Sequence, residues 1–498
     1  MRLFVLASTL LLSPLTGARV TSPETPKPRP GLTVKTTSGT YTGFVNSTVP
    51  DVKQWLGIPY GRPPVGNRRF MPPEKAPDYG TADATAYKPV CIQNSGNKTG
   101  IFWELVPEFQ NADPQSEDCL YLNVWAPRKP VEKKVPVIVW VCGGGFREGG
   151  GHAPYQVPDQ WIQRTQTHIV VAFNYRLNIF GFPGSPAASK NAGLMDVRLV
   201  TEWLKDNIEA FGGDPDRMVL YGQSAGANAV LTYGYAYPHD PIVNGLIASS
   251  GGASATNPTS SSSFHNLAQI VGCANLTTTA ELACMQEVDP LVLQKKIEGT
   301  EGPAFRGSFG PIADNVTVFA NLTDRLEKGL VPKLPLITGY TFNEAAAFLP
   351  FHINDTAPPT PTMPGSDRLS CGVKNEVEMR SAYGLTTYYY LYSGNFSNIT
   401  PRYWLGGMHS SDIPLVFGTH HQFRGNSTEL EWQTSYAMEA FWVSFAAKSS
   451  ENPRNHLDLV WPEYTADNSQ IVVFGNSTGP SASYVAPVAI ADKYGGDC

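Results

Sequence analysis

The sequence predicts an α/β fold built around a large, mostly parallel β-sheet. From about residue 135 onward, short apolar runs typical of buried strands alternate with segments of helical periodicity. A sheet that arises from this alternation is covered by helices on both faces, and its functional groups are expected on loops at the carboxyl ends of the strands. The composition agrees, because 42% apolar residues, 16% charged residues, 46 Gly and 42 Pro in 498 residues describe a compact, loop-rich protein with a deep core.

Short runs of mostly β-branched or aliphatic residues are the predicted strands, and several are bounded by Gly, Asn or Pro. Between the second and third runs, the apolar residues of 194–211 recur at a spacing near 3.6 and are followed by Gly212 and Gly213, which predicts an amphipathic helix with a glycine stop. The serine run 260–263 is interpreted as a low-complexity loop. The predicted strands are residues 137–141, 169–173, 218–221, 246–248, 336–337 and 471–474.

Net charge argues against one class of partner, and the cysteine count indicates a free thiol. A formal net charge of −6 argues against a nucleic-acid partner that is bound through general basicity. The seven cysteines are an odd number, so at least one thiol has no internal partner in an oxidising compartment. The sequence does not specify an oligomeric state.

The amino terminus predicts export. A short basic start, the apolar run 3–12 and small residues ending at Ala18 have the layout of a secretory signal peptide over residues 1–18. The run is too short to span a bilayer, and no other stretch approaches the length of a transmembrane anchor. An excess of Asn-x-Ser/Thr sequons favours a secreted, extracellular glycoprotein, while the alternative is an apolar first helix in a cytosolic protein. The sequons are at Asn46, Asn97, Asn275, Asn315, Asn321, Asn354, Asn395, Asn398, Asn426 and Asn476.

The motif Gly222-Gln223-Ser224-Ala225-Gly226 follows one predicted strand and opens a helix-compatible run. Small residues two positions before and after a serine allow the cramped strand-to-helix turn that lifts its hydroxyl clear of a sheet. The pattern alone is weak, because Gly-x-Ser-x-Gly also arises by chance in a chain with this much Gly and Ser.

A second copy, residues 475–479, is centred on Ser477. Pro480 follows it and no helical pattern does, and Asn476 beside the serine belongs to a sequon. No histidine lies beyond His456, so the chain order serine, acid, histidine cannot be completed from Ser477. The sequence therefore favours Ser224 as a nucleophile and indicates a loop at Ser477.

A glycine-rich loop, Cys142-Gly143-Gly144-Gly145-Phe146, follows the first predicted strand. Bare glycines let backbone N–H groups approach a substrate, as an oxyanion hole requires. A tight structural turn and a phosphate-binding loop are the alternatives, although neither Gly-x-Gly-x-x-Gly nor the Lys-Ser/Thr end of a P-loop is present.

These motifs together resemble those of the type-B carboxylesterases, the α/β-hydrolase group that includes cholinesterases, secreted fungal esterases and large yeast lipases. The resemblance runs from about residue 57 to residue 417 and is greatest to the secreted fungal members. It implies an α/β-hydrolase fold, ester hydrolysis with Ser224 as nucleophile, and an oxyanion hole formed by the N–H groups of Gly144, Gly145 and Ala225. The matching segments are residues 57–60, 116–124, 143–146, 174–177 and 211–215, the last leading into 222–226.

A serine nucleophile needs a base, and spacing alone does not choose it among the histidines that follow Ser224. The resemblance selects His409, whose flanking residues 406–414 match the family's Gly-x-x-His loop. His420 and His421 are a chance pair or a weak metal site, but no partner at ligand spacing supports a metal. The histidines after the serine are His239, His265, His352, His409, His420, His421 and His456.

The resemblance places the acid at Glu344, on a loop after the predicted strand that begins at residue 336. Thr341 and Ala345 depart from the family's Asn and Gly at this turn. Asp314 is the main competitor, and the resemblance gives its segment a structural role. The order Ser224, Glu344, His409 is the one expected of α/β-hydrolases.

The resemblance implies that a small-molecule or lipid ester is hydrolysed through an acyl-enzyme without a cofactor. Cys142 and Gln223 stand where the family often has His or an aromatic residue and Glu, so they are expected to affect substrate preference. A triacylglycerol lipase with a mobile lid is the first alternative. A non-catalytic cholinesterase-like adhesion ectodomain is a second, and it is disfavoured because all three catalytic residue types stand in matching motifs.

The resemblance also pairs cysteines. It implies that Cys91–Cys119 closes a flap near residues 91–119 and that Cys273–Cys284 closes a small loop. Cys371 and Cys498 could pair with each other, which leaves Cys142 as the free thiol. Residues 19–498 are expected to form a single domain.

Overall fold

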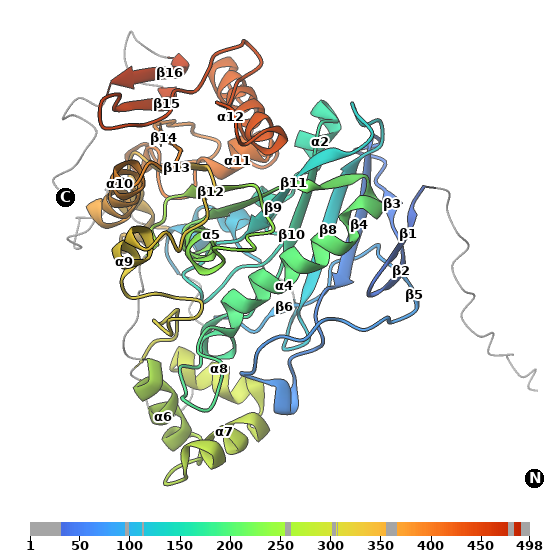
Figure 1. The fold of residues 1–498 in the computed structure, drawn as a ribbon, viewed down its shortest axis with the longest axis vertical. Coiled ribbons are helices and arrows are strands. Elements are labelled where there is room, and N and C mark those ends of the chain that lie inside the picture. Colours follow the sequence, from blue (N-terminus) through green and yellow to red (C-terminus); the bar gives the residue numbers. More distant parts are fainter. Residues whose placement is uncertain are drawn as a thin grey trace, which may run out of the picture.

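The fold was obtained as a computed structural model, and it describes residues 31–94, 99–111, 114–253, 260–300, 305, 307–354, 366–476 and 483–489. The predicted signal peptide lies outside the described residues, as do Asn97, Ser477 and Cys498. Figure 1 shows a long, twisted sheet with helices packed against it.

The central sheet has eleven strands, and its middle is parallel while its edges are antiparallel. This is the mostly parallel sheet that the sequence predicts. In spatial order its strands are β16 (Ser483–Ala489), β15 (Gln470–Asn476), β14 (Thr387–Tyr392), β13 (Leu336–Thr341), β12 (Gly245–Ser249), β11 (Gly213–Gln223), β9 (Val135–Val141), β10 (Ile169–Phe173), β8 (Tyr121–Pro127), β4 (Val52–Pro59) and β3 (Phe44–Val45). The structure also describes two small sheets. One consists of β1 (Thr33–Thr36), β2 (Gly39–Thr42) and β5 (Thr81–Asp83), and the other of β6 (Val90–Cys91) and β7 (Gln115–Ser116).

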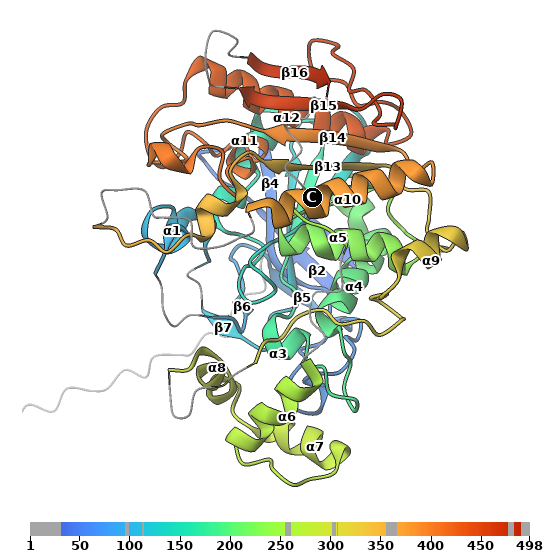
Figure 2. The same ribbon diagram turned by 90° about the vertical axis from the view of Figure 1, so that its left-hand side faces the viewer.

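Helices cover both faces of the sheet (Figure 2). On one face α4 packs on β11, α5 on β11 and β12, and α10 on β13 and β14; on the other, α12 contacts β9, β11 and β15, and α2 contacts β8. The helices are α1 (Ile101–Glu104), α2 (Asp159–Thr165), α3 (Asn178–Gly181), α4 (Ala192–Asn207), α5 (Ala225–Ala236), α6 (Ser260–Ile270), α7 (Thr278–Glu287), α8 (Pro290–Glu298), α9 (Leu322–Glu327), α10 (Ser366–Ala382), α11 (Ile413–Val416) and α12 (Glu429–Ala447). Short 3-10 turns are η1 (Gly66–Arg68), η2 (Pro107–Phe109), η3 (Pro154–Gln156), η4 (Ile208–Phe211), η5 (Glu344–Phe348) and η6 (Tyr403–Leu405).

The middle strands are apolar along their whole length because both of their faces are covered. Every residue of β9, β10 and β12 is buried. The helix predicted over residues 194–211 forms as α4 followed by η4, and it ends at Gly212, which has a φ of 94°. Glycine adopts this left-handed conformation without the strain that a Cβ would cause.

Two local expectations differ from the structure. The serine run 260–263 is not a loop, because it begins α6. The buried residues Phe264, Leu267 and Ala268 follow at helical spacing and anchor this segment, and serine is tolerated in a first helical turn. The predicted strands also leave out β14, whose buried side chains include Tyr388 and Tyr390 rather than an aliphatic run.

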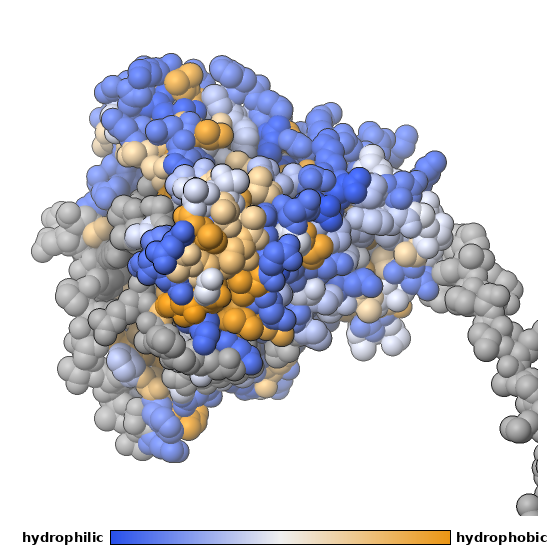
Figure 3. All heavy atoms as spheres, turned by 90° about the horizontal axis from the view of Figure 1, so that it is seen from below, coloured by the Kyte–Doolittle hydropathy of each residue, from blue (hydrophilic) through white to orange (hydrophobic). Residues whose placement is uncertain are grey.

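Helices α6, α7 and α8 lie at the lower end of the molecule in Figure 1. Figure 3 looks at this end and shows apolar side chains gathered on it. Leu276, Leu291 and Val292, on or beside these helices, are 43%, 53% and 38% exposed. Within the described ranges, no helix is both long enough and apolar enough to cross a membrane.

Candidate active site

Ser224 lies at the turn between β11 and α5, with a φ of 57° and a ψ of −123°. Its neighbours explain this turn. A Cβ at Gly222 would collide with the carbonyl oxygen of Gly226, and a Cβ at Gly226 would collide with that of Val141. Both positions therefore require glycine, and the strained turn presents the serine at the carboxyl end of the sheet.

His409 and Glu344 form a buried pair. Nδ1 of His409 contacts Oε2 of Glu344, and each residue is 3% exposed. The other carboxylate oxygen, Oε1, accepts the backbone N–H of Thr341 at 2.8 Å. Burial by itself would raise the pKa of Glu344, but the His409 ring and the Thr341 amide hold that pKa below its usual value. Glu344 thus remains a carboxylate that can orient the imidazole.

The second ring nitrogen of His409 faces the residue before the serine. Nε2 of His409 lies 3.0 Å from the side-chain nitrogen of Gln223. Because Nδ1 faces a carboxylate, we assign the ring proton to Nδ1, so Nε2 accepts from the Gln223 amide. In this tautomer Nε2 is the hydrogen-bond acceptor of the ring, and His409 lines the same cavity as Ser224.

The glycine-rich loop packs against this turn. A Cβ at Gly143 would lie 2.8 Å from the carbonyl oxygen of Gln223 and 3.2 Å from the Cβ of Ser224. Gly144 and Gly145 have φ values of 104° and 63°. The loop after β9 therefore brings backbone beside Ser224 in a conformation that favours glycine.

These groups open onto a cavity of about 780 Å³. One part of its lining is apolar and comes from the segment around α1 and from η5. Another part is polar and includes Asn111, Glu148 and Gln156. Ser224 itself is half-buried, so its side chain is reachable from the cavity. The main apolar lining residues are Ile101, Phe102, Trp103, Phe109, Phe348 and Leu349.

The competing acid lies outside this arrangement. Oδ1 of Asp314 accepts backbone N–H groups from residues 316–318, and its Oδ2 accepts from the Asn191 side chain. These hydrogen bonds hold a loop together. Of the described residues, Glu344 is the carboxylate that contacts His409.

The other histidines also have different surroundings. His239, His352 and His456 are exposed. His265 contacts Glu281 at 2.5 Å, and Nδ1 of His420 is 2.6 Å from the Ser427 hydroxyl. Among the described residues, no three His, Cys, Asp or Glu side chains gather as a metal site.

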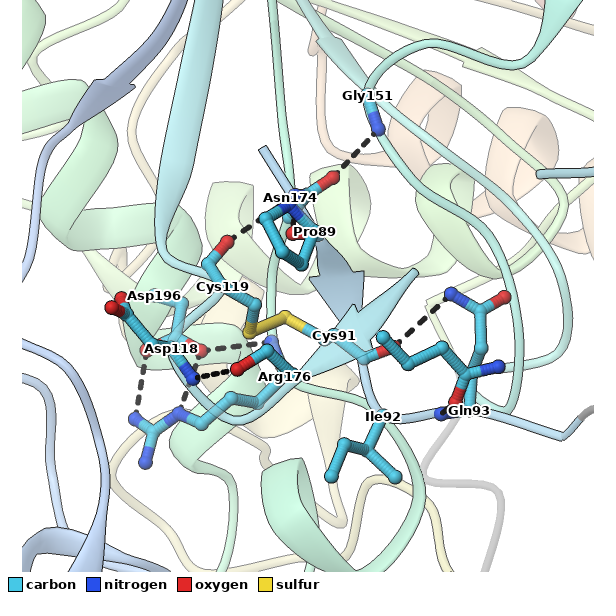
Figure 4. The surroundings of a disulfide bond; sticks show 12 residues. Pro89, Cys91, Ile92, Gln93, Asp118, Cys119, Gly151, Asn174, Arg176 and Asp196 are labelled. Carbon is cyan, nitrogen blue, oxygen red and sulfur yellow. Dashed lines mark hydrogen bonds and ion pairs between the residues drawn. A yellow bond between two sulfur atoms is a disulfide. The ribbon is translucent and has the colours of Figure 1, made fainter. Parts of the chain in front are cut away.

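The flap is closed by the Cys91–Cys119 disulfide. Figure 4 shows Asn174 beside it, where the Asn174 side chain donates to the carbonyl oxygens of Pro89 and Cys119 and accepts the Gly151 N–H. These bonds tie both ends of the flap to Asn174, which directly follows β10, and they tie Asn174 to Gly151 in the segment after β9.

The tip of the flap is also held. Arg424 pairs with Glu108 and donates to the Leu105 carbonyl oxygen at 2.8 Å. Glu104 accepts the Ile353 N–H at 2.6 Å. The flap is therefore tied to two segments far away in the chain.

The remaining cysteines divide into bonded and free. Cys273 and Cys284 form a disulfide, Cys371 is disulfide-bonded, and Cys142 is free and buried. Burial raises the pKa of the Cys142 thiol to about 12. The thiol is thus neutral at physiological pH, and it lines the cavity beside the glycine-rich loop.

A thiol titration tests this arrangement. The native protein should give no reaction at neutral pH, because the Cys142 thiol is buried and protonated. Unfolding without a reductant should expose one reactive thiol, and peptide mapping of the labelled product should locate it at Cys142. Three reactive thiols would contradict the bonded state of Cys371.

The predicted glycosylation sites differ in accessibility. Asn46 and Asn476 are half-buried, and Asn398 is only 6% exposed. The Asn398 amide nitrogen donates to the His420 carbonyl oxygen at 2.8 Å and to Glu431 at 2.9 Å. A sugar on this nitrogen would have to displace these contacts, so of the ten predicted glycosylation sites we expect this one to be unoccupied. The exposed sequon residues are Asn275, Asn315, Asn321, Asn354, Asn395 and Asn426.

Glycopeptide mapping provides the check. We expect the Asn398 sequon to be unoccupied in folded, secreted protein because its amide is buried and bonded. The nearby exposed Asn395 is the matched site for the same measurement. A glycan on Asn398 in protein that retains its folded circular dichroism would contradict the prediction.

Sequence reasoning missed two carboxyl groups near the site. Oδ2 of Asp412 accepts the Tyr390 hydroxyl at 2.9 Å, and burial raises the pKa of Asp412 to about 6. Glu148 lines the cavity, and burial raises its pKa to about 6 as well. Asp412 lies in the matched segment 406–414 but outside its Gly-x-x-His positions, and Glu148 lies beyond the glycine-rich loop, so the motifs did not mark either residue.

A carboxylesterase family model matches residues 30–363 and 363–485. The chain is 43% identical over 464 residues to a chlorogenic acid esterase of Aspergillus niger, covering 89% of this chain and 90% of that protein. It is 37% identical over 462 residues to secreted lipase 5 of Gibberella zeae, covering 84% of this chain and 86% of that protein.

Among solved structures, the chain is similar to a thermophilic pNB esterase with a TM-score of 0.74 and 26% identity, covering 92% of this chain and 97% of that one. This confirms the predicted α/β-hydrolase fold, with its eleven-stranded mixed sheet flanked by helices. The extent of the family match and of both alignments also confirms the resemblance inferred from the motifs. The chain therefore belongs to the carboxylesterase family and is a carboxylic ester hydrolase.

Proposed function

We propose that this protein is a secreted serine esterase that works through an acyl-enzyme on Ser224. His409 acts as the general base and Glu344 orients it. The observation that carries the proposal is the buried Glu344–His409 pair, whose histidine lines the same cavity as a serine held on a strained turn.

The reaction follows from the protonation states of these groups. Nε2 of His409 takes the Ser224 proton as the hydroxyl oxygen attacks the ester carbonyl, and Glu344 stabilises the imidazolium that forms. The imidazolium then protonates the leaving alcohol. Water repeats the sequence on the acyl-enzyme and releases the acid.

The oxyanion of each tetrahedral intermediate needs preorganised donors. We assign this role to the backbone N–H groups of Gly144, Gly145 and Ala225. The packing of the glycine-rich loop against Ser224 supports the first two, and the position of Ala225 at the start of α5 supports the third. No cofactor takes part in these steps.

Covalent labelling tests the nucleophile. A phosphonate ester reacts with an activated serine and forms a stable adduct in place of the acyl group. We expect one equivalent to inactivate the enzyme and mass spectrometry to find the adduct on the peptide that contains Ser224. A stoichiometric adduct on another residue would disprove the assignment.

We further propose that soluble esters are the preferred substrates. The flap is anchored by the Arg424–Glu108 pair, by the Ile353–Glu104 hydrogen bond and by its disulfide, and Ser224 is reachable with the flap in this position. A mobile lid would need to break these contacts. The name of the 43% identical relative makes chlorogenic acid the first ester to assay.

A lipase remains the second candidate, and exposed aromatic side chains favour it. Phe348 contacts Phe102 of the flap and is 47% exposed, and Phe342 is 65% exposed. Large apolar groups that face solvent are suited to contact with a lipid surface. Activity on a triglyceride should saturate below its solubility limit for an esterase and rise sharply above that limit for a lipase.

Disulfide bonds, as well as the predicted signal peptide, support our proposal that the protein is secreted. Disulfides persist in oxidising compartments, and this chain contains the Cys91–Cys119 and Cys273–Cys284 bonds. We propose that residues 1–18 are removed on export and that residues 19–498 act as one domain. Amino-terminal sequencing of secreted protein would locate the cleavage site.

A further inference from the structure

The polar part of the cavity contains hydrogen-bonding groups that the proposed mechanism does not use. Glu148 lies just beyond the glycine-rich loop, Asn111 follows η2, and Gln156 ends η3. The elements η2 and η3 are in contact with each other. Three polar side chains from neighbouring segments therefore line one cavity with Ser224.

Asn111 is the least satisfied of the three. It is only 8% exposed, and neither its side-chain oxygen nor its side-chain nitrogen has a hydrogen-bond partner among the described residues. A Cβ at Gly150 would lie 3.0 Å from Oδ1 of Asn111, which places this amide beside the loop that carries Glu148. A buried amide without partners costs free energy, so its presence on a cavity wall points to a ligand that supplies them.

Glu148 runs alongside the glycine-rich loop, since its Cγ lies 3.1 Å from the position that a Cβ of Gly144 would take. Its carboxyl group makes no ion pair or hydrogen bond with any described residue. With a pKa of about 6, the carboxyl changes protonation near neutral pH and can donate or accept a hydrogen bond.

Gln156 is held in place by the rest of the core. Its Oε1 accepts the indole N–H of Trp140 at 3.0 Å. This bond leaves the NH2 group of Gln156 as the end of the side chain that can serve a ligand. The cavity thus combines unpaired donors with unpaired acceptors close to the reaction centre.

A hydroxyl group is the ligand chemistry that matches this combination, because it donates one hydrogen bond and accepts others. We propose that Glu148 and Asn111, supported by Gln156, form a hydroxyl-binding subsite that selects esters carrying hydroxyl groups on their acyl or alcohol part. This inference rests on the proposed function of Ser224 and names the substrate class for that site. The apolar wall formed by Phe102, Phe109 and Phe348 would take the remaining, apolar part of such an ester.

Matched substrate pairs test the subsite. Methyl cinnamate and methyl 3,4-dihydroxycinnamate differ only in hydroxyl groups on the acyl side, and propyl butanoate and glycerol monobutanoate differ only on the alcohol side. The wild-type enzyme should have a higher kcat/KM for the hydroxylated member of at least one pair. The pair that shows this preference identifies which side of the ester occupies the subsite.

Two variants remove the polar groups without removing catalytic residues. In Glu148→Leu and Asn111→Leu, kcat/KM for the preferred hydroxylated ester should fall about tenfold more than kcat/KM for the plain ester, the equivalent of one lost hydrogen bond. Glu148→Gln, which retains a donor and an acceptor, should restore most of the preference. Glu287→Leu, at an exposed position on α7, is the matched control.

Stability provides an independent readout. Because the Asn111 side chain has no hydrogen-bond partner among the described residues, Asn111→Leu should keep or raise the thermal midpoint. An equal loss of activity on both members of a pair, or no wild-type preference in either pair, would overturn the subsite. Failure of the proposed nucleophile is distinguishable, since Ser224→Ala would then still hydrolyse both members.

Discussion

Ser224→Ala should lower kcat/KM for every ester by at least about 10⁴-fold while leaving the far-ultraviolet circular dichroism unchanged. The loss is large because the serine hydroxyl is the proposed nucleophile, and without it the Glu344–His409 pair has no hydroxyl to activate. The fold should be retained because the strained turn depends on Gly222 and Gly226 rather than on the serine hydroxyl. Initial rates on a soluble nitrophenyl ester provide the measurement.

Ser477→Ala is the matched control, because Ser477 stands in the second Gly-x-Ser-x-Gly motif of the same chain. Its activity should equal that of the wild type. If the two variants lost activity equally, or if Ser224→Ala kept more than about a tenth of the wild-type rate, the nucleophile would have to be sought elsewhere.

Glu344→Gln should lower kcat by about a thousandfold or more. The amide is nearly isosteric with the carboxylate, but it no longer favours the tautomer with the proton on Nδ1 of His409, and it cannot stabilise the imidazolium. Substrate affinity should change little, since Glu344 is separated from the substrate by His409. Steady-state kinetics that separate kcat from KM will show this pattern.

The same variant has a predicted pH signature. The folded protein lowers the pKa of Glu344, so the ionised carboxylate stabilises the fold above the usual carboxyl pKa of about 4, and this stabilisation is lost as the pH falls through the lower folded value. The thermal midpoints of wild type and Glu344→Gln should therefore converge on acidification.

Asp314→Asn is the control for the assignment of the acid. Because it alters the loop carboxylate, it should reduce stability but leave kcat near the wild-type value. A thousandfold loss of kcat in this variant would reverse the assignment of the acid.

The parts of the fold that a linear pattern could predict are those with a strong local signal. Strand β10 coincides with the apolar run 169–173, because a strand buried on both faces is apolar at every position. Strand β14 was missed because its core residues are tyrosines, whose hydroxyls make them look half-polar. The serine run 260–263 was misread because its helix is determined by the buried residues that follow it.

The candidate site likewise contains some residues that local motifs mark and others that only the folded chain brings together. Ser224 and the glycine-rich loop lie in motifs whose glycines are required where two stretches of backbone approach closely. Because these glycines are visible in the sequence, both parts of the site could be predicted from it. Glu148 and Asn111 matter through a cavity that forms only when distant segments meet, and no local pattern marks them. Asn398 shows the converse, since a sequon can be recognised from three residues, whereas the tertiary contacts that bury its amide cannot.

The order of the strands has a consequence for how this enzyme regains activity after unfolding. Gln223 and His409, whose side chains meet in the site, are 186 residues apart, and β9 lies between β10 and β11 in the sheet. Parallel neighbours of this kind pair late, because closing long stretches of chain costs entropy before any contact repays it. Helical circular dichroism should therefore recover before ester hydrolysis, and enzymatic activity becomes the more stringent measure of complete refolding.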